Sequence, residues 1–193
     1  MVRNWVAALI GVAGIVAGGL VGPAVVGSTG TMAAPPGDPA LADRIAVEDL
    51  VTRYYQNFGG DAAGQFGSYY IEDAVFDVNG VISTGRAEIE ALYAAMDAGG
   101  DAPATQGTFH MIISNPVVDV AGDSATAQFL WTGVMNSDIK ARPQLFEQGR
   151  EYDKLVRQGG KWLIAKRVVI ADSGLPERFA ATYQPRKDYD ITQ

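Results

Sequence analysis

The second half of the chain is dominated by a two-residue periodicity in the polarity of its side chains. Segments with this period are predicted to be strands, and four long ones occur: Phe109 to Val120, Ser124 to Met135, Phe146 to Arg157, and Lys161 to Ala171. Short glycine-containing turns follow the first and the third, so these strands are expected to pair antiparallel. In the last segment both alternating sets are largely apolar, which indicates a sheet covered on both faces. We therefore expect helices on one face and another subunit, of a homodimer or homotrimer, on the other.

A helical periodicity precedes these strands and predicts three helices. The first begins at Asp38-Pro39, where aspartate can cap a helix and proline suits its first turn, and it ends at Gly59-Gly60. The second is short and runs from Asp61 to about Tyr69, and the third ends at Gly99-Gly100. A small hairpin around Asn79-Gly80 lies between the second and the third. This order predicts an α+β fold with helices packed on one sheet face.

The N-terminal segment contains no charged residue between Arg3 and Asp38. An apolar run from Trp5 to Val26 is followed by small residues up to Ala33 and Ala34. These are the parts of a secretory signal peptide, so we expect a periplasmic or secreted protein that is cleaved near those alanines. The alternative is an uncleaved membrane anchor, the one case in which we expect contact with a membrane. The expected organisation is a leader with its linker (1–37), a folded domain (38–175) and a tail (176–193).

The composition disfavours several classes of function. Acidic residues outnumber basic ones by 22 to 15, and a net charge of −7 argues against nucleic-acid binding. The chain has no cysteine, which excludes disulfides, thiol catalysis and cysteine-ligated zinc, and its single histidine, His110, makes a multi-histidine metal site improbable. We therefore expect no metal and no cofactor. The chemistry would rely on carboxylates, tyrosines, arginines and one imidazole.

Five short motifs follow one another in the order and spacing of a known family. They are Ile45 to Val51, Tyr70 to Phe76, Gly85 to Ile89, Asn115 to Ala127, and Gly160 to Arg167. In these motifs the chain resembles the SnoaL-like branch of the nuclear transport factor 2-like superfamily, from Ala40 to Ala171. The resemblance implies a cone in which three N-terminal helices pack on a curved antiparallel sheet and enclose an apolar pocket.

The resemblance also implies a catalytic histidine. Scytalone dehydratase and hexachlorocyclohexane dehydrochlorinase use a histidine base that an aspartate holds, and His110 matches the histidine. The aspartate position falls on Gly59, so this chain departs from the pair. A neutral imidazole, with an ordinary pKa of about 6.5, can take a proton from a substrate. The alternative is a half-buried histidine that a backbone carbonyl or a tyrosine satisfies.

Aromatic residues supply further candidates. Tyr54 and Tyr55 lie on the buried face of the first helix, where a phenol can donate to a developing oxyanion, and Tyr54 is the catalytic candidate. As ordinary core residues, both would need no ligand. The resemblance implies that Phe76, Phe129 and Trp131 line the cone. Together with Tyr55, Asn115 and Val169, they are expected to contact a flat aromatic ligand.

Glu151 and Arg167 complete the predicted site, because a charge that points inward from a central strand needs a partner. A three-residue loop over Gln158-Gly159-Gly160 would place Glu151 directly opposite Arg167. A two-residue loop would instead place Tyr152 opposite Arg167 and turn Glu151 to the other face. The pair is either a structural ion pair or a device in which Arg167 holds a substrate anion and Glu151 relays a proton.

These observations predict a cofactor-independent lyase for a small aromatic or polycyclic molecule. Water, or a fragment such as formaldehyde, would leave after proton transfer by His110. One alternative is a non-catalytic protein of the cell envelope that binds a hydrophobic small molecule. The other is an isomerase or cyclase with the same base.

Overall fold

The computed structural model describes residues 39–56, 63–98, 108–185 and 189–192, so the predicted leader lies outside the described residues. Its elements are close to those predicted from the periodicity. In chain order they are α1 (Pro39–Gln56), the 3-10 helix η1 (Ala63–Tyr69), β1 (Tyr70–Val78), β2 (Val81–Thr84), α2 (Arg86–Ala98), β3 (Thr108–Ala121), β4 (Ser124–Asn136), β5 (Gln144–Gln158), β6 (Lys161–Ser173) and the 3-10 helix η2 (Glu177–Phe179).

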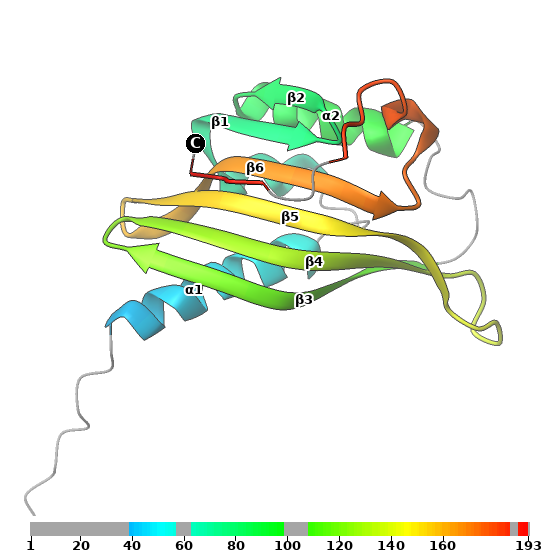
Figure 1. Cartoon of the computed structure of the whole chain (residues 1–193), viewed down its shortest axis with the longest axis horizontal. Helices are drawn as coiled ribbons and strands as arrows, with labels where there is room; N and C mark the ends of the chain where they lie inside the picture. The colour runs from blue at the N-terminus through cyan, green and yellow to red at the C-terminus, as the bar shows by residue number, and fades with distance from the viewer. Residues whose placement is uncertain (1–38, 57–62, 99–107, 186–188, 193) are drawn as a thin grey trace, which may run out of the picture. The chain divides into compact units, whose positions relative to one another are not determined.

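The strands form a six-stranded sheet in the order β2-β1-β6-β5-β4-β3 (Figure 1). The four long strands pair antiparallel as predicted, and β1 pairs antiparallel with β2. However, β1 and β6 are parallel, so the prediction of an antiparallel sheet is wrong and the sheet is mixed. A parallel pair requires a long crossover, and the whole stretch from β2 to β5 provides it here.

The prediction of three helices is also wrong, because the described residues before the long strands contain two α-helices. The segment predicted as the second helix is the 3-10 helix η1. Gly64 and Gly67 lie within its seven residues, and each glycine costs an α-helix about 1 kcal/mol relative to alanine. None of the described helices is long and apolar enough to cross a membrane.

Two hairpin turns follow from glycine and asparagine in the sequence. The predicted turn between β1 and β2 has φ angles of 52° at Asn79 and 87° at Gly80. The turn between β5 and β6 consists of Gly159 and Gly160, with φ angles of 57° and 77°. Positive φ at both central residues matches the twist of the flanking strands, and few other residues adopt it without strain.

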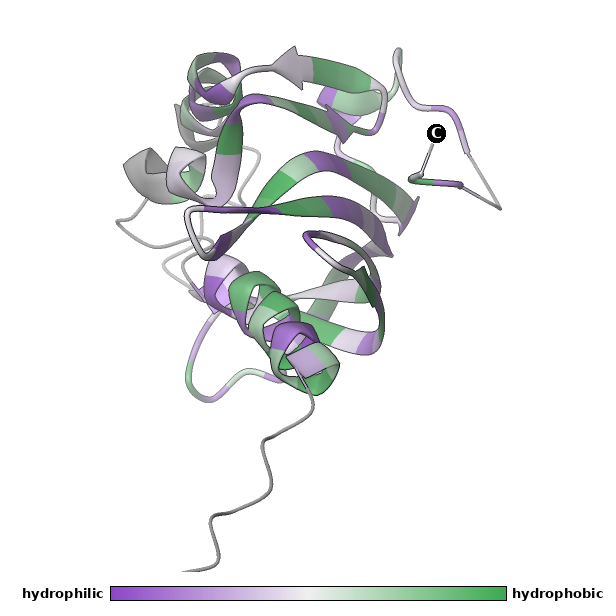
Figure 2. Cartoon of the chain, turned by 90° about the vertical axis from the view of Figure 1, so that its left-hand side faces the viewer, coloured by the Kyte–Doolittle hydropathy of each residue, from purple (hydrophilic) through white to green (hydrophobic). Residues whose placement is uncertain are grey.

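One face of the sheet packs against the helices, and we call it the inner face. The sheet curves around α1, which packs against β3 and β6, whereas α2 packs against β1 and β2 (Figure 2). Val47, Val51 and Tyr54 of α1 are buried there. They contribute to one continuous core with alternate residues of every long strand, such as Phe129 and Ile164.

The opposite, outer face is partly covered by the chain itself. Ile191, close to the C-terminus, is buried in a cluster with Tyr152, Val168 and Ile170 of β5 and β6. The hydroxyl of Tyr183 donates a hydrogen bond to the Ala171 carbonyl at 2.6 Å. The predicted tail thus packs on the face where we expect a second subunit, and the homodimer or homotrimer stays a prediction.

Candidate functional site

A cluster of buried charged side chains lies at the centre of the inner face. Arg167 of β6 and both Glu151 and Asp153 of β5 have no exposed surface, and we call these three residues the charge cluster. The Arg167 guanidinium binds Asp153 in a bidentate manner, with Nε 2.8 Å from Oδ1 and Nη2 2.9 Å from Oδ2. Its Nη2 also lies 3.1 Å from Oε1 of Glu151. The burial of Arg167 is therefore compensated by two carboxyl groups.

A β-bulge determines which residues join the charge cluster. The two-residue turn at Gly159-Gly160 would by itself place Tyr152 opposite Arg167. The pairing shifts by one residue within β6, between Ile164 and Lys166, so Asp153 lies opposite Arg167. Neither of the two predicted registers occurs. With the two-residue turn alone, Glu151 would face away from Arg167. The bulge shifts the pairing by one residue, which turns Glu151 to the same face as Arg167.

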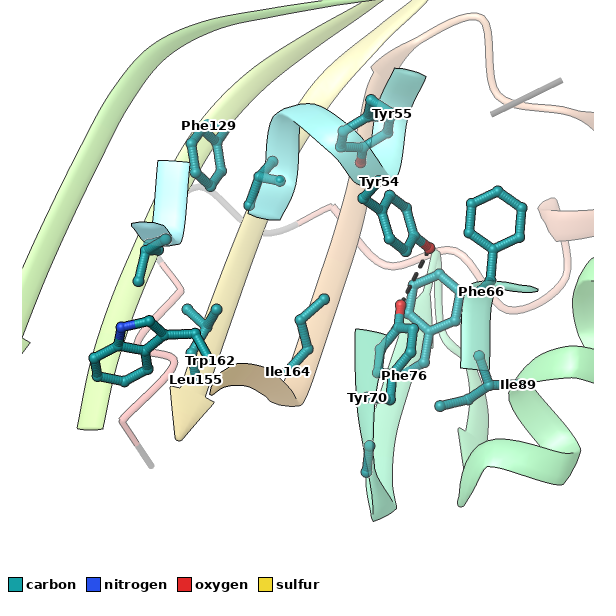
Figure 3. Close-up of a cluster of buried hydrophobic side chains, with 14 of the residues drawn as sticks. Tyr54, Tyr55, Phe66, Tyr70, Phe76, Ile89, Phe129, Leu155, Trp162 and Ile164 are labelled. Carbon is teal, nitrogen blue, oxygen red and sulfur yellow. Dashed lines mark hydrogen bonds between the residues drawn. The ribbon is translucent and has the colours of Figure 1, made fainter. Parts of the chain in front are cut away.

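Tyr54 of α1 covers the charge cluster. Its ring centroid lies 4.0 Å from Cζ of Arg167, which is a cation–π contact. Its hydroxyl forms hydrogen bonds with the Tyr70 hydroxyl, at 3.1 Å, and with the Tyr93 hydroxyl; Figure 3 shows Tyr54 and Tyr70 meeting in the core. Burial raises the pKa of Tyr54 to about 12, against the lowering effect of Arg167. Tyr54 is thus a neutral phenol whose hydroxyl is engaged by other tyrosines.

Burial also controls the protonation of the charge cluster. It raises the pKa of Glu151 to about 8, although Arg167 lowers that pKa. The Tyr55 hydroxyl donates a hydrogen bond to Oε2 of Glu151, and burial raises the pKa of Tyr55 well above its usual range. Burial lowers the pKa of Arg167, but Asp153 and Glu151 outweigh this and hold it well above its usual range. Burial thus favours the protonated form of Glu151, while the bidentate Asp153 carboxylate neutralises Arg167.

Four of the predicted ligand contacts surround the charge cluster. Phe76 lies beside Arg167 on β1, while Phe129 and Val169 lie beside Glu151 on the two strands that flank it. Trp131 occupies the next inward position of β4. The structure therefore brings these residues together with Tyr54 and Tyr55, and their contact with a ligand stays a prediction.

Two predicted site residues do not join this group. His110 is exposed, and its ring contacts only the hydroxyl of Thr108, at 3.5 Å, among the described residues. It alternates with Met111, which packs on the core, so it points to the outer face. Asn115 is also exposed and lies at a bulge of β3, with a φ of 53°. The position of the missing aspartate, Gly59, lies outside the described residues.

Glu147 is a third inward carboxyl group of β5 and one that the sequence analysis missed. It lies opposite Gly133 of β4, and the absence of a side chain there leaves room for it. A Cβ built on Gly133 would lie 2.8 Å from Cγ of Glu147 and 2.7 Å from Cζ of Phe109. Burial raises the pKa of Glu147 to about 7, although Arg178 lowers it. Among the described residues, the Glu147 carboxyl group has no hydrogen bond and no ion pair.

The sequence analysis missed Asp153 and Glu147, and the alternation of inward and outward side chains along β5 could have identified both. Glu147, Glu151 and Asp153 are separated by even numbers of residues, so a strand that directs Glu151 inward also directs the other two inward. They differ in their surroundings. Asp153 is neutralised inside the charge cluster, whereas Glu147 is half-buried and has a pKa suited to accepting and returning a proton near neutral pH. No three acidic or histidine side chains gather into a metal site within the part of the chain that the structure describes.

Comparison with known proteins gives a family and a fold. A family model described as a SnoaL-like domain matches residues 39–168. No curated protein sequence matches. Similar solved structures include Aln2 from a Streptomyces species (TM-score 0.59, 22% identity, 70% of this chain and 93% of that chain) and ActVI-ORFA from Streptomyces coelicolor (0.59, 21%, 68% and 98%). Another is a candidate scytalone dehydratase from Novosphingobium aromaticivorans (0.58, 15%, 79% and 95%). At these identities, the likeness shows the fold alone.

Proposed function

The chain belongs to the SnoaL-like domain family, and on this basis we propose that it is a cofactor-independent lyase that transfers a proton on a small aromatic molecule. The nuclear transport factor 2-like superfamily, of which this family is a branch, includes cofactor-independent dehydratases and cyclases. The proposed ligand lies on the inner face, beside Phe109, Trp131 and Glu147. Large aromatic side chains there provide the apolar surface that a flat ligand requires.

The state of Glu147 is the observation that carries this proposal. A general acid or base works best when its pKa is close to the working pH, and burial places the pKa of Glu147 at about 7. Its carboxyl group is not committed to another described side chain, in contrast to Glu151. We therefore assign the proton transfer to Glu147 rather than to His110, which is exposed on the outer face.

Glu151, Arg167 and Tyr54 have a supporting role in this proposal. The charge cluster is fully buried and Asp153 neutralises Arg167, although Nη1 of Arg167 and Oε1 of Glu151 have no hydrogen-bond partner among the described residues. It holds β5 and β6 in register and thereby fixes Glu147, four residues from Glu151 on the same strand. The bidentate pairing with Arg167 commits the Asp153 carboxylate to a structural role, which favours the second candidate function, a non-catalytic protein that binds the same kind of ligand.

The test uses 3-hydroxy-1-tetralone, an aromatic β-hydroxy ketone that becomes 1-naphthol when it loses water. With Glu147 as the base that removes the α-proton, kcat/KM is expected to rise with pH through an apparent pKa near 7, because the base acts in its ionised form. The formation of 1-naphthol is followed by fluorescence between about pH 5 and pH 9.

Three other outcomes would change this conclusion. A rate that does not change with pH would contradict the role of Glu147. Binding without turnover would favour the non-catalytic binding protein. An isomer or a ring-closed product, identified by mass spectrometry, would favour an isomerase or cyclase.

A further inference from the structure

We propose that the indole N–H of Trp131 is a recognition group that donates a hydrogen bond to a ligand oxygen, so that the site selects aromatic molecules with a carbonyl or phenolate oxygen. The location of this ligand rests on the proposed function. The recognition itself requires no turnover, and the test below is a binding measurement for that reason.

The first observation is an unsatisfied donor. The Trp131 side chain is 3% exposed, and its Nε1 has no hydrogen-bond partner among the described residues. An indole nitrogen can only donate, so it must find an acceptor or remain unpaired. Leaving a buried donor unpaired is unfavourable, and buried donors therefore nearly always have a partner. A ligand oxygen would supply the missing acceptor.

The second observation is the space that two glycines create. Trp131 lies opposite Gly149, and a Cβ built on Gly149 would lie only 2.4 Å from Cζ2 and 2.7 Å from Cε2 of the Trp131 ring. Any larger residue at Gly149 would displace the indole, whose Nε1 is bonded to Cε2. Gly133 does the same for Glu147 on the neighbouring strand. The two glycines thus place Trp131 and Glu147 on adjacent inward positions of β4 and β5.

The two polar groups complement each other chemically. In the proposed reaction Glu147 takes the α-proton of a β-hydroxy ketone, and the electron pair of the broken C–H bond moves to the carbonyl oxygen. The Trp131 N–H stabilises that oxygen as its negative charge develops. When the enolate collapses, the β C–O bond breaks and the leaving oxygen takes the proton back from Glu147. The products are water and an enone, which tautomerises to the phenol.

Trp162 is a matched comparison within the same chain. It is also buried, at 7% exposure, and its Nε1 likewise has no hydrogen-bond partner among the described residues. However, its ring lies 4.6 Å from Cζ of Arg157, and it is next to the β5–β6 turn, far along β6 from the Glu147 end of the sheet. The Asp43 carboxylate lies close enough to the Trp162 N–H for this donor to lower the Asp43 pKa, after the larger effect of Arg157, so Trp162 has an acceptor nearby within the protein. We assign no ligand to it.

The test titrates the full-length, 15N-tryptophan-labelled protein with 1-tetralone and with tetralin, which has the same ring system but no oxygen. The Nε1–H signals are assigned from Trp131→Phe and Trp162→Phe. 1-Tetralone is expected to shift the Trp131 signal downfield, and tetralin is expected not to. In calorimetry, Trp131→Phe is expected to weaken 1-tetralone binding about 5- to 10-fold, the worth of one hydrogen bond, and to leave tetralin binding unchanged. Trp162→Phe is expected to change neither affinity.

Three outcomes would overturn the inference. If 1-tetralone binds without moving the Trp131 signal, the indole does not contact the oxygen. Equal losses for both probes would reduce Trp131 to a packing residue, and no binding of 1-tetralone would remove the proposed ligand class. Should Trp131→Phe not fold, Trp5→Phe and Trp162→Phe assign the Trp131 signal by elimination, and its shift in the wild-type protein decides. A shifted Trp131 signal without any turnover would contradict the lyase and leave this inference intact.

Discussion

Replacement of Arg167 by methionine is expected to lower the free energy of unfolding by about 3–5 kcal/mol at pH 7, which is a large part of the stability of a domain of this size. Methionine preserves most of the side-chain volume but removes the cation that Asp153 binds in a bidentate manner. The carboxylate would then be buried without compensation. Urea denaturation followed by near-UV circular dichroism measures the loss.

The pH dependence of this loss follows from Glu151. Its pKa in the folded state, about 8, lies above its value in an unfolded chain, so its contribution makes the wild-type protein less stable as the pH rises to about 8. Because Arg167 lowers this pKa, its removal raises the pKa further. The variant therefore continues to lose stability above pH 8, and its deficit is expected to be larger at pH 9 than at pH 7.

Two further variants identify the cause of the loss. Arg53→Met removes an exposed cation that is paired with Asp49 at 2.6 Å, and it is expected to leave the free energy of unfolding almost unchanged, because solvent screens exposed ion pairs. Replacement of Arg167, Glu151 and Asp153 together by apolar residues of similar volume is expected to restore most of the stability, because no charge is left unpaired. If the triple variant were as unstable as the single one, packing rather than charge would be responsible.

Glu147→Gln is expected to lower kcat for the dehydration of 3-hydroxy-1-tetralone about 10²- to 10⁴-fold, the usual contribution of a general base or acid. Glutamine has nearly the same shape and fits over Gly133, but it cannot accept the proton. Affinity for 1-tetralone should change little, because the proposed oxygen contact is made by Trp131. Single-turnover rates and calorimetry on the same preparation measure both quantities.

His110→Ala is the informative comparison for this prediction. The resemblance to histidine-dependent relatives predicts a comparable loss of rate, whereas the exposed position of His110 on the outer face predicts almost none. A large loss in His110→Ala together with an unchanged rate in Glu147→Gln would contradict our assignment and return the proton transfer to the imidazole.

The sequence by itself was enough for the family, the four long strands and the hairpin at Asn79-Gly80. These features depend on local periodicity and on residues that tolerate positive φ. Both can be recognised in the sequence without any knowledge of the tertiary contacts. It also indicated that Glu151 and Arg167 need each other, since an inward charge on a central strand requires a partner. The inward positions of Phe76, Phe129 and Trp131 were implied by the resemblance to the family, whose members line their cone at these positions.

Only the tertiary structure decided how these pieces combine into a site. The bulge in β6 shifts the pairing by one residue and makes Asp153, rather than Glu151 or Tyr152, the residue opposite Arg167. The register of β3 against the core places His110 on the outer face. The pKa of Glu147 depends on burial that its own strand does not specify. A one-residue shift reverses which face a side chain occupies, and burial is set by residues distant in sequence, so neither can be obtained from local pattern alone.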